Sequence, residues 1–181
     1  MKRIVSTFMF VAVTVSLVTG CATAPRTAEG RAELNTKVRN AIDKAVKSDT
    51  GLKKFFDESA GYAVFPTVGK GAVGVGGAFG RGELYEAGLL EGYCTLTQAS
   101  IGLALGGQAY TELIFFETQS ALDRFKTGNF AFAAQASAVA LKSGASANAK
   151  YTDGVAVFTM GEAGLMYEAS IGGQKFSYKP K

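Results

Sequence analysis

AVGVGGAFGRG, at residues 72–82, is the stretch that decides the fold class of this chain. Its even-numbered positions carry only glycine or alanine, whereas its odd-numbered positions include Val73, Val75 and Phe79. Side chains alternate between the two faces of a strand, so the pattern predicts a strand with one bulky face and one bare face. Glycine inside a strand is costly and usually marks a bend or a close approach by another backbone or a ligand. We therefore expect a sheet whose bare face either packs closely against its neighbours or forms a smooth groove for an acyl chain.

The alternation continues beyond this stretch. Ile101, Leu103 and Leu105 again alternate with glycine or alanine, and thirteen of the 23 glycines lie between Gly61 and Glu117. A two-residue period of this kind predicts a series of strands separated by turns. The expected strands span residues 62–68, 71–86, 91–105, 108–117, 130–141, 154–160, 164–171 and 174–178.

Turn residues indicate how these strands connect. Gly106-Gly107 and Gly172-Gly173 each predict a hairpin turn, and Pro66 predicts an edge or a bulge in the first strand. Sequential strands with short turns predict a β-rich antiparallel sheet, closed or folded on itself like a barrel or a sandwich. Because helical segments accompany this body, the expected fold class is α+β.

Three segments have the spacing of helices. Residues 28–48 carry apolar side chains at helical intervals, which predicts an N-terminal amphipathic helix. Residues 52–58 predict a second, short helix. A third is expected at residues 118–128, with Thr118 as its N-cap.

Four long blocks follow one another along the chain. They are GYAVFPTVGKGAVGVGGAFGRGELY (61–85), YCTLTQASIGLALGGQAYTELIFF (93–116), FKTGNFAFAAQASAVA (125–140) and GVAVFTMGEAGLMYEASIGGQKFSYKP (154–180). Together they resemble the SYLF domain, and the resemblance covers about residues 52–181. It implies binding of phospholipids, with phosphoinositides as the ligands discussed for eukaryotic members and actin as a further partner of some of them.

The N-terminus predicts export and lipidation. Lys2 and Arg3 precede an apolar run, and the residues Val18-Thr19-Gly20-Cys21 that close it resemble a bacterial lipobox. We expect a signal peptide at residues 1–20, acyl chains such as palmitate on Cys21, and a tether at residues 21–29. An ordinary secretory signal with a chance cysteine is the alternative.

The resemblance to bacterial lipoproteins also implies a location. Ala22 follows the cysteine where an aspartate would favour retention in the inner membrane, so the expected place is the cell envelope, at the outer membrane. Residues 30–181 are expected to form a single domain, with helices at about 30–58 and a β-rich body at about 61–181.

Residue counts exclude several kinds of site. The chain has no histidine, which excludes Ser-His and Cys-His catalysis and the HExxH zinc motif. Lipidation of Cys21 would leave Cys94 alone in an apolar strand, as a buried and inert thiol. Residues 69–74 fit GxGxxG, but a strand is expected after them where a nucleotide site needs a helix. We therefore expect no metal and no cofactor.

Carboxylates are the remaining groups for acid–base chemistry. Glu112 and Glu117 flank an apolar run, but nothing in the sequence brings them together. We expect no catalytic residue and no enzymatic activity.

Basic residues gather in one N-terminal segment. Residues 37–54 contain six basic and two acidic residues, in a chain whose formal net charge is +4. Each Lys or Arg close to an anionic membrane contributes about 1 kcal/mol to binding, so this segment is the first candidate for contact with lipid headgroups. An ordinary solvated helix that covers the sheet is the alternative. The candidate lipid-binding residues are Lys37, Lys44, Lys47, Lys53, Lys54, Lys70 and Arg81.

These observations favour a non-catalytic, membrane-anchored lipoprotein that binds phospholipid through headgroups and acyl chains. One rival is a structural or adaptor lipoprotein that binds an envelope protein or a cell-wall polymer, and another is an envelope hydrolase acting through carboxylates. No motif or arginine-rich stripe indicates binding of nucleic acid. Because bacteria generally lack phosphoinositides and eukaryotic actin filaments, neither is expected as a ligand.

Overall fold

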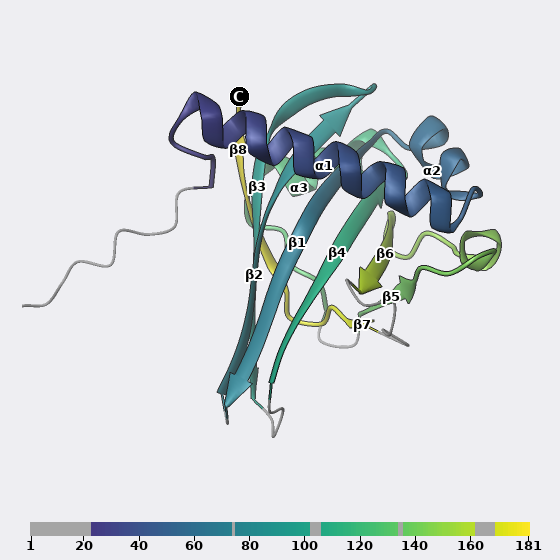
Figure 1. The fold of residues 1–181 in the computed structure, drawn as a ribbon. Coiled ribbons are helices and arrows are strands. Elements are labelled where there is room, and N and C mark those ends of the chain that lie inside the picture. Colours follow the sequence, from purple (N-terminus) through teal and green to yellow (C-terminus); the bar gives the residue numbers. More distant parts are fainter. Residues whose placement is uncertain (1–22, 74, 102–105, 134–135, 162–168) are drawn as a thin grey trace, which may run out of the picture.

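The computed structural model describes residues 23–73, 75–101, 106–133, 136–161 and 169–181 (Figure 1). The predicted signal peptide and the predicted lipidation site at Cys21 lie outside these residues. Within them, no helix is both long enough and apolar enough to cross a membrane.

Two helices precede the sheet and have the predicted bounds. Helix α1 (Ala28–Ser48) begins after Thr27, whose hydroxyl accepts a hydrogen bond from the Gly30 N–H. Helix α2 (Leu52–Glu58) follows after a short corner. The amphipathic prediction for α1 is confirmed, because one side of the helix is buried against the sheet. The buried residues of α1 are Leu34, Val38, Ala41 and Ala45.

The strands form one eight-stranded sheet in the order β7-β5-β6-β4-β1-β2-β3-β8. Their bounds are β1 (Gly61–Val73), β2 (Val75–Glu86), β3 (Leu89–Ile101), β4 (Gly106–Phe116), β5 (Ser137–Ala140), β6 (Val155–Gly161), β7 (Ala169–Ser170) and β8 (Lys175–Pro180). Strand β5 pairs in parallel with β6, whereas the other described pairs are antiparallel, so the sheet is mixed. The α+β class is confirmed, but the sheet is mixed and not purely antiparallel as predicted. The edge strands β7 and β8 do not pair in the described part of the chain, so of the two predicted forms, closed or folded on itself, the closed barrel is excluded.

The glycine-rich strands connect differently from the prediction. Val73 at the end of β1 pairs with Val75 at the start of β2, so the strand expected at 71–86 is divided between β1 and β2. Strands β3 and β4 are separated by β1 and β2, so the hairpin expected at Gly106-Gly107 is also wrong. These two glycines belong to β4 and pair with β1. An alternating pattern has the same period on both sides of a tight turn, and it therefore cannot locate the turn.

Two smaller predictions have mixed outcomes. The pairing of β1 with its neighbours shifts around Pro66, which confirms the predicted bulge although β1 is a central strand. Gly172 and Gly173 do form a turn, and Gly173 has a positive φ of 75° that favours glycine. The strands on either side of this turn, β7 and β8, pair with different neighbours, so it is not a hairpin.

Helix α3 (Gln119–Lys126) follows β4 and is capped as predicted, because the Thr118 hydroxyl accepts a hydrogen bond from the Ala121 N–H. Within the described residues of the strand expected at 130–141, Ser137–Ala140 form β5 and Ala131 forms an isolated bridge with Lys175. A short helix, η1 (Ala145–Asn148), follows. An alanine-rich segment has little preference for strand, and here Phe130 and Phe132 pack their rings against Phe176 instead.

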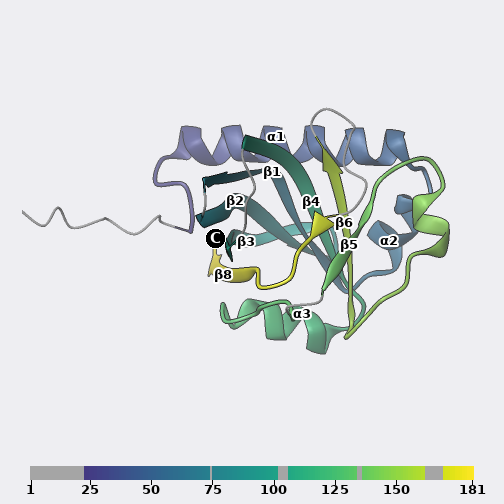
Figure 2. The ribbon, with the colours of Figure 1, turned by 90° about the horizontal axis from the view of Figure 1, so that it is seen from below.

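The two faces of the sheet carry separate cores. Helix α1 covers one face, and α3 packs on the opposite face (Figure 2). The glycines of β2 make room for side chains of β1 on the face of α3. A Cβ added at Gly82 would lie 2.8 Å from Cδ1 of Phe65, and one added at Gly80 would lie 2.9 Å from Cγ2 of Val68. This part of the bare face is therefore closely packed and leaves no groove, whereas residues 102–105, where a groove was also considered, lie outside the described part.

Candidate functional site

Exposed lysines occupy the outward side of the N-terminal helices. Lys37 and Lys44 are seven residues apart in α1 and so share one side of the helix, and Lys47 lies one turn further along. Lys53 and Lys54 continue the basic surface on α2. All five are exposed to solvent, as the prediction of a headgroup site requires. We call these five residues the lysine surface.

Two of the five residues of the lysine surface form ion pairs in the described structure. The Lys37 ammonium lies 2.7 Å from Glu33 Oε1, and the Lys54 ammonium lies 3.9 Å from Glu58 Oε2. Among the described residues, no carboxylate lies within ion-pair distance of the other three lysines of this surface. Lys44, Lys47 and Lys53 therefore form no ion pair in the described structure.

The other two predicted basic residues lie apart from each other. Arg81 and Lys37 both line a shallow groove of about 420 Å³, between the start of α1 and the outer face of β1 and β2. The Arg81 guanidinium lies 5.7 Å from the centre of the Phe79 ring. Gly69 lines the same groove, and because neighbouring strand residues face opposite ways, Lys70 points to the other face. The structure thus brings Arg81 close to the lysine surface and separates Lys70 from it.

A buried carboxylate fixes the corner between α1 and α2. One oxygen of Asp49 accepts a hydrogen bond of 2.6 Å from the Ser146 N–H, and the other accepts one of 3.0 Å from the Gly51 N–H. Burial acts to raise the pKa of Asp49, but these hydrogen bonds to the charged form outweigh it and lower the pKa below its ordinary value. The corner is held to η1 in this way, which positions Lys47 and Lys53 on either side of it.

A polar cluster lies between α1 and the sheet. The Tyr85 hydroxyl donates a hydrogen bond of 2.6 Å to the buried Glu83 carboxylate, and the Asn35 amide donates a second of 3.0 Å from α1. Burial and the neighbouring Glu83 raise the pKa of Tyr85. Sequence analysis missed this cluster, although Glu83 stands on the face of β2 that the alternation predicts to be bulky.

A second polar cluster lies in the core on the opposite face. The Gln174 amide donates hydrogen bonds of 3.0 Å to the Glu112 carboxyl and 3.1 Å to the Tyr110 hydroxyl. Burial raises the pKa of Glu112 to about 8. Glu117, the other carboxylate considered as a pair, is exposed beyond the end of β4, and no interaction joins the two among the described residues. The geometry provides no acid–base pair here.

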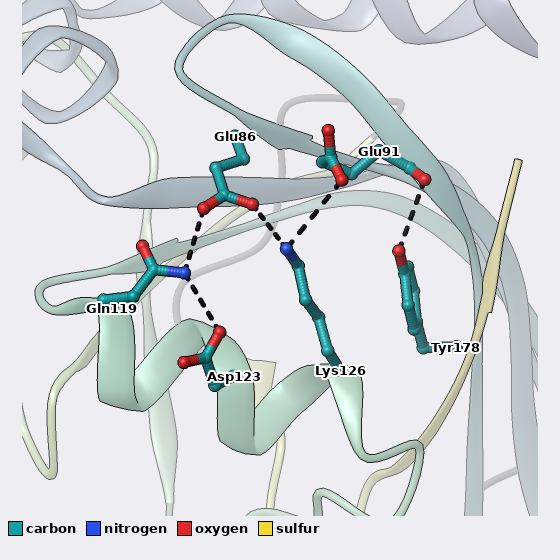
Figure 3. A network of polar contacts seen from close by, with 6 residues as sticks. All are labelled: Glu86, Glu91, Gln119, Asp123, Lys126 and Tyr178. Atoms are coloured by element: carbon teal, nitrogen blue, oxygen red, sulfur yellow. Dashed lines mark hydrogen bonds and ion pairs between the residues drawn. The ribbon is translucent and has the colours of Figure 1, made fainter.

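A network of polar contacts holds α3 to the sheet (Figure 3). The Lys126 ammonium is paired with Glu86 and lies 3.9 Å from Glu91. The Gln119 amide donates hydrogen bonds to Glu86 at 2.9 Å and to Asp123 at 3.0 Å. These contacts join both ends of α3 to β2 and β3 and fix the orientation of the helix.

A cavity of about 1040 Å³ lies beside α3. Its apolar lining includes Phe130, Phe132, Val157 and Ile171, and its charged lining residues are Arg124, Lys150 and Asp153. The lining comes from α3, the segment after it, β5, the end of η1 and residues 149–153 before β6, β6 itself, and Ile171 before β8, so the sequence did not predict this cavity. No single stretch of sequence carries its pattern.

The remaining predictions concern thiols and metals. Cys94 is fully buried, and burial raises the pKa of its thiol well above the ordinary value, as expected of an inert cysteine. In the described ranges, no group of three or more acidic or cysteine side chains is arranged to hold a metal ion.

Sequence comparison identifies proteins to which this chain is similar. Residues 97–180 match the model of the Ysc84 (SYLF) family, described as "Las17-binding protein actin regulator". Over 158 residues, the chain is 31% identical to Beta cell expansion factor A of Aeromonas veronii. This alignment covers 84% of the chain and 59% of the relative, so the chain spans well under two thirds of that protein.

Proposed function

We propose that the protein is a non-catalytic, lipid-anchored protein of the bacterial envelope that binds anionic phospholipid through its lysine surface, and the match of residues 97–180 to the Ysc84 (SYLF) family model supports this. Lipid binding is known for this domain in general.

One observation carries the proposal. Lys44, Lys47 and Lys53 are exposed and have no compensating carboxylate within ion-pair distance in the described structure. The opposite side of α1 is buried against the sheet, so α1 presents Lys44 and Lys47 on a fixed support. Lys53 follows on α2, which is held in place by its buried Leu52 and Phe55. Each such lysine contributes about 1 kcal/mol near an anionic surface, and three together favour binding by roughly a hundredfold.

Lipidation of Cys21 is the second part of the proposal. An anchor at Cys21 is joined to α1 by only a few residues, because α1 begins at Ala28. Acyl chains contribute about 0.8 kcal/mol for each buried methylene, so two or more chains hold a protein firmly at a bilayer. The anchor then keeps the lysine surface close to headgroups of the outer membrane, and the weaker electrostatic contact orients the domain.

Charge reversal on the lysine surface tests the proposal. All the described helices and strands lie after residue 22, so the chain from residue 21 with Cys21→Ser retains the described fold without its anchor. We expect the variant Lys44→Glu, Lys47→Glu, Lys53→Glu to lose co-sedimentation with vesicles of phosphatidylglycerol and phosphatidylcholine. The matched control, Lys142→Glu, Lys175→Glu, Lys179→Glu, makes the same change in net charge at other exposed positions and should still bind.

Equal binding by the two triple variants would remove the lysine surface from consideration. If the parent chain itself bound neither anionic nor neutral vesicles, the adaptor function would become the better explanation. A pull-down from envelope proteins and cell-wall polymer would then be the measurement that follows.

A further inference from the structure

The cavity beside α3 has the lining of a binding site for an amphiphile. One part of its lining is apolar, where Phe130 packs against Phe125 and Phe132 at centre-to-centre distances of 5.7 and 5.2 Å. Rings held by several neighbours keep their positions, so this phenylalanine wall is formed before any ligand arrives. Polar residues complete the lining: Thr127, Asn129, Ser137, Asn148 and Thr152. At about 1040 Å³, the cavity is at the upper end of the sizes usual for small-molecule sites, about 300–1,000 Å³.

The charged residues of the cavity favour an anion. Arg124 and Lys150 contribute two positive charges to the lining, against one negative charge from Asp153. Both basic side chains are exposed, so they stand where the cavity meets solvent. The Arg124 guanidinium donates a hydrogen bond of 2.7 Å to the Asp153 carbonyl and lies 5.5 Å from the centre of the Phe130 ring. It is thus positioned at the junction between the apolar wall and the solvent, with further N–H groups available for an anionic head.

We propose that this cavity binds a single acyl chain with an anionic head, with the chain against the phenylalanine wall and the head at Arg124 and Lys150. Only the class of ligand, a lipid, is taken from the proposed function. Its site is separate from the lysine surface, because α1 and α3 lie on opposite faces of the sheet (Figure 2). A free fatty acid and one chain of a membrane phospholipid share this chemistry, and the test distinguishes these two sources.

The first arm of the test uses dodecanoate as the probe. The chain from residue 21 with Cys21→Ser is freed of co-purifying lipid and titrated calorimetrically with dodecanoate below the concentration at which it forms micelles. Acetate, which lacks the tail, and dodecanol, which lacks the charge, are the matched ligands. We expect one dodecanoate to bind per chain, acetate not to bind, and dodecanol to bind more weakly.

Variants then locate the bound probe. Arg124→Gln with Lys150→Gln should weaken dodecanoate binding by about tenfold or more, since each hydrogen bond to a charged group contributes about 1.5–3 kcal/mol. Ala136→Trp should abolish binding by filling the cavity, and Ala131→Trp does so from an exposed lining position that the fold tolerates more readily. Lys44→Gln on the other face is the control and should bind dodecanoate as the parent does.

The outcomes separate the two proposals. The two proposals together predict that the lysine variants lose vesicle binding and still bind dodecanoate. That result would confirm two separate sites. If dodecanoate binds and the cavity variants also weaken vesicle binding, the ligand of the cavity is one acyl chain of a membrane phospholipid. If the cavity variants bind vesicles as the parent does, the ligand is a free fatty acid. Failure of the folded parent to bind dodecanoate would overturn the cavity proposal. Normal binding by both tryptophan variants would overturn it as well.

Discussion

The ring of Phe65 in β1 lies directly over Gly82 in β2, where a Cβ would come within 2.8 Å of its Cδ1 atom and would also contact the Val64 carbonyl oxygen. The space that a side chain at Gly82 would fill is therefore occupied by the Phe65 side chain of the neighbouring strand β1. Glycine is required at this position by the proximity of β1, because the backbone and the ring leave no room for a methyl group.

We expect Gly82→Ala to lower the free energy of unfolding by about 1–3 kcal/mol, the usual cost of overpacking. Gly69→Ala is the matched control, since a Cβ at Gly69 would have no neighbour within 4 Å. Urea denaturation of both variants measures the difference. Equal changes in unfolding free energy for Gly82→Ala and Gly69→Ala would show that the contact with Phe65 does not explain the glycine at position 82.

The alternating pattern predicted the strands of this sheet better than it predicted their connections. The bounds of α1 and α2, the cap at Thr118 and the bulge at Pro66 follow from local signals, and the structure confirms them. The hairpin expected at Gly106-Gly107 is wrong because β4 pairs with β1, and this pairing depends on long-range contacts that a periodic sequence does not specify.

The candidate site was also predictable only in part, because some of its features depend on long-range contacts. Exposure of the five lysines follows from helical spacing, but spacing does not predict which of them form ion pairs. Glu33 and Glu58 pair with lysines four residues away, whereas Asp43 and Asp57, at the same spacing from Lys47 and Lys53, form no ion pair with them in the described structure. Lys70 could not be assigned to a face of the sheet until the bulge at Pro66 was located, because it follows the bulge in β1. The cavity beside α3 could not be predicted, because its walls come from segments that are far apart in sequence.

Glu112 should make the stability of the fold depend on pH. Its pKa is about 8 in the folded chain against an ordinary 4.5, so its favourable contribution is complete below about pH 4.5 and is lost as the pH rises through about 8. Relative to Glu112→Gln, the parent should lose up to about 1.4 kcal/mol of unfolding free energy per pH unit in this window.

Urea denaturation of the parent and Glu112→Gln across this window measures the difference. Glu117→Gln, at an exposed position, is the control and should follow the parent at every pH. A constant difference between the parent and Glu112→Gln from pH 4.5 to 8 would contradict a raised pKa at Glu112.

Asp49 should have the opposite pH dependence. Its pKa is lowered below the ordinary 3.8, so the stability it contributes is present above that pH and is lost as the pH falls through the lower, folded value. We expect Asp49→Asn to cost about 1.5–3 kcal/mol of unfolding free energy at neutral pH, because the charged hydrogen bonds to Ser146 and Gly51 are weakened.

The exposed Asp57→Asn serves as the matched control for this substitution and should leave the unfolding free energy unchanged within about 0.5 kcal/mol. Thermal or urea unfolding at neutral pH compares the two variants. Similar stabilities of Asp49→Asn and Asp57→Asn would mean that the corner between α1 and α2 is held by other contacts.

Lipidation at Cys21 predicts the start and the mass of the N-terminal peptide of the mature protein. The protein isolated from membranes of a bacterial host should begin at Cys21 and carry acyl chains there, and Cys21→Ser should release it from the membrane fraction. Mass spectrometry of the N-terminal peptide measures both features. An unmodified N-terminus at Cys21 or elsewhere in the membrane-bound protein would contradict the anchor.

The salt dependence of vesicle binding tests the central claim most directly. The chain from residue 21 with Cys21→Ser is sedimented with phosphatidylglycerol-containing vesicles and with neutral phosphatidylcholine vesicles, from about 0.01 to 1 M salt, over which the Debye length falls from about 30 to 3 Å. Binding through Lys44, Lys47 and Lys53 predicts strong association with the anionic vesicles at low salt, a steep loss as salt rises, and no association with the neutral vesicles. Association that is equal for the two vesicles, or independent of salt, would contradict an electrostatic headgroup site on the lysine surface.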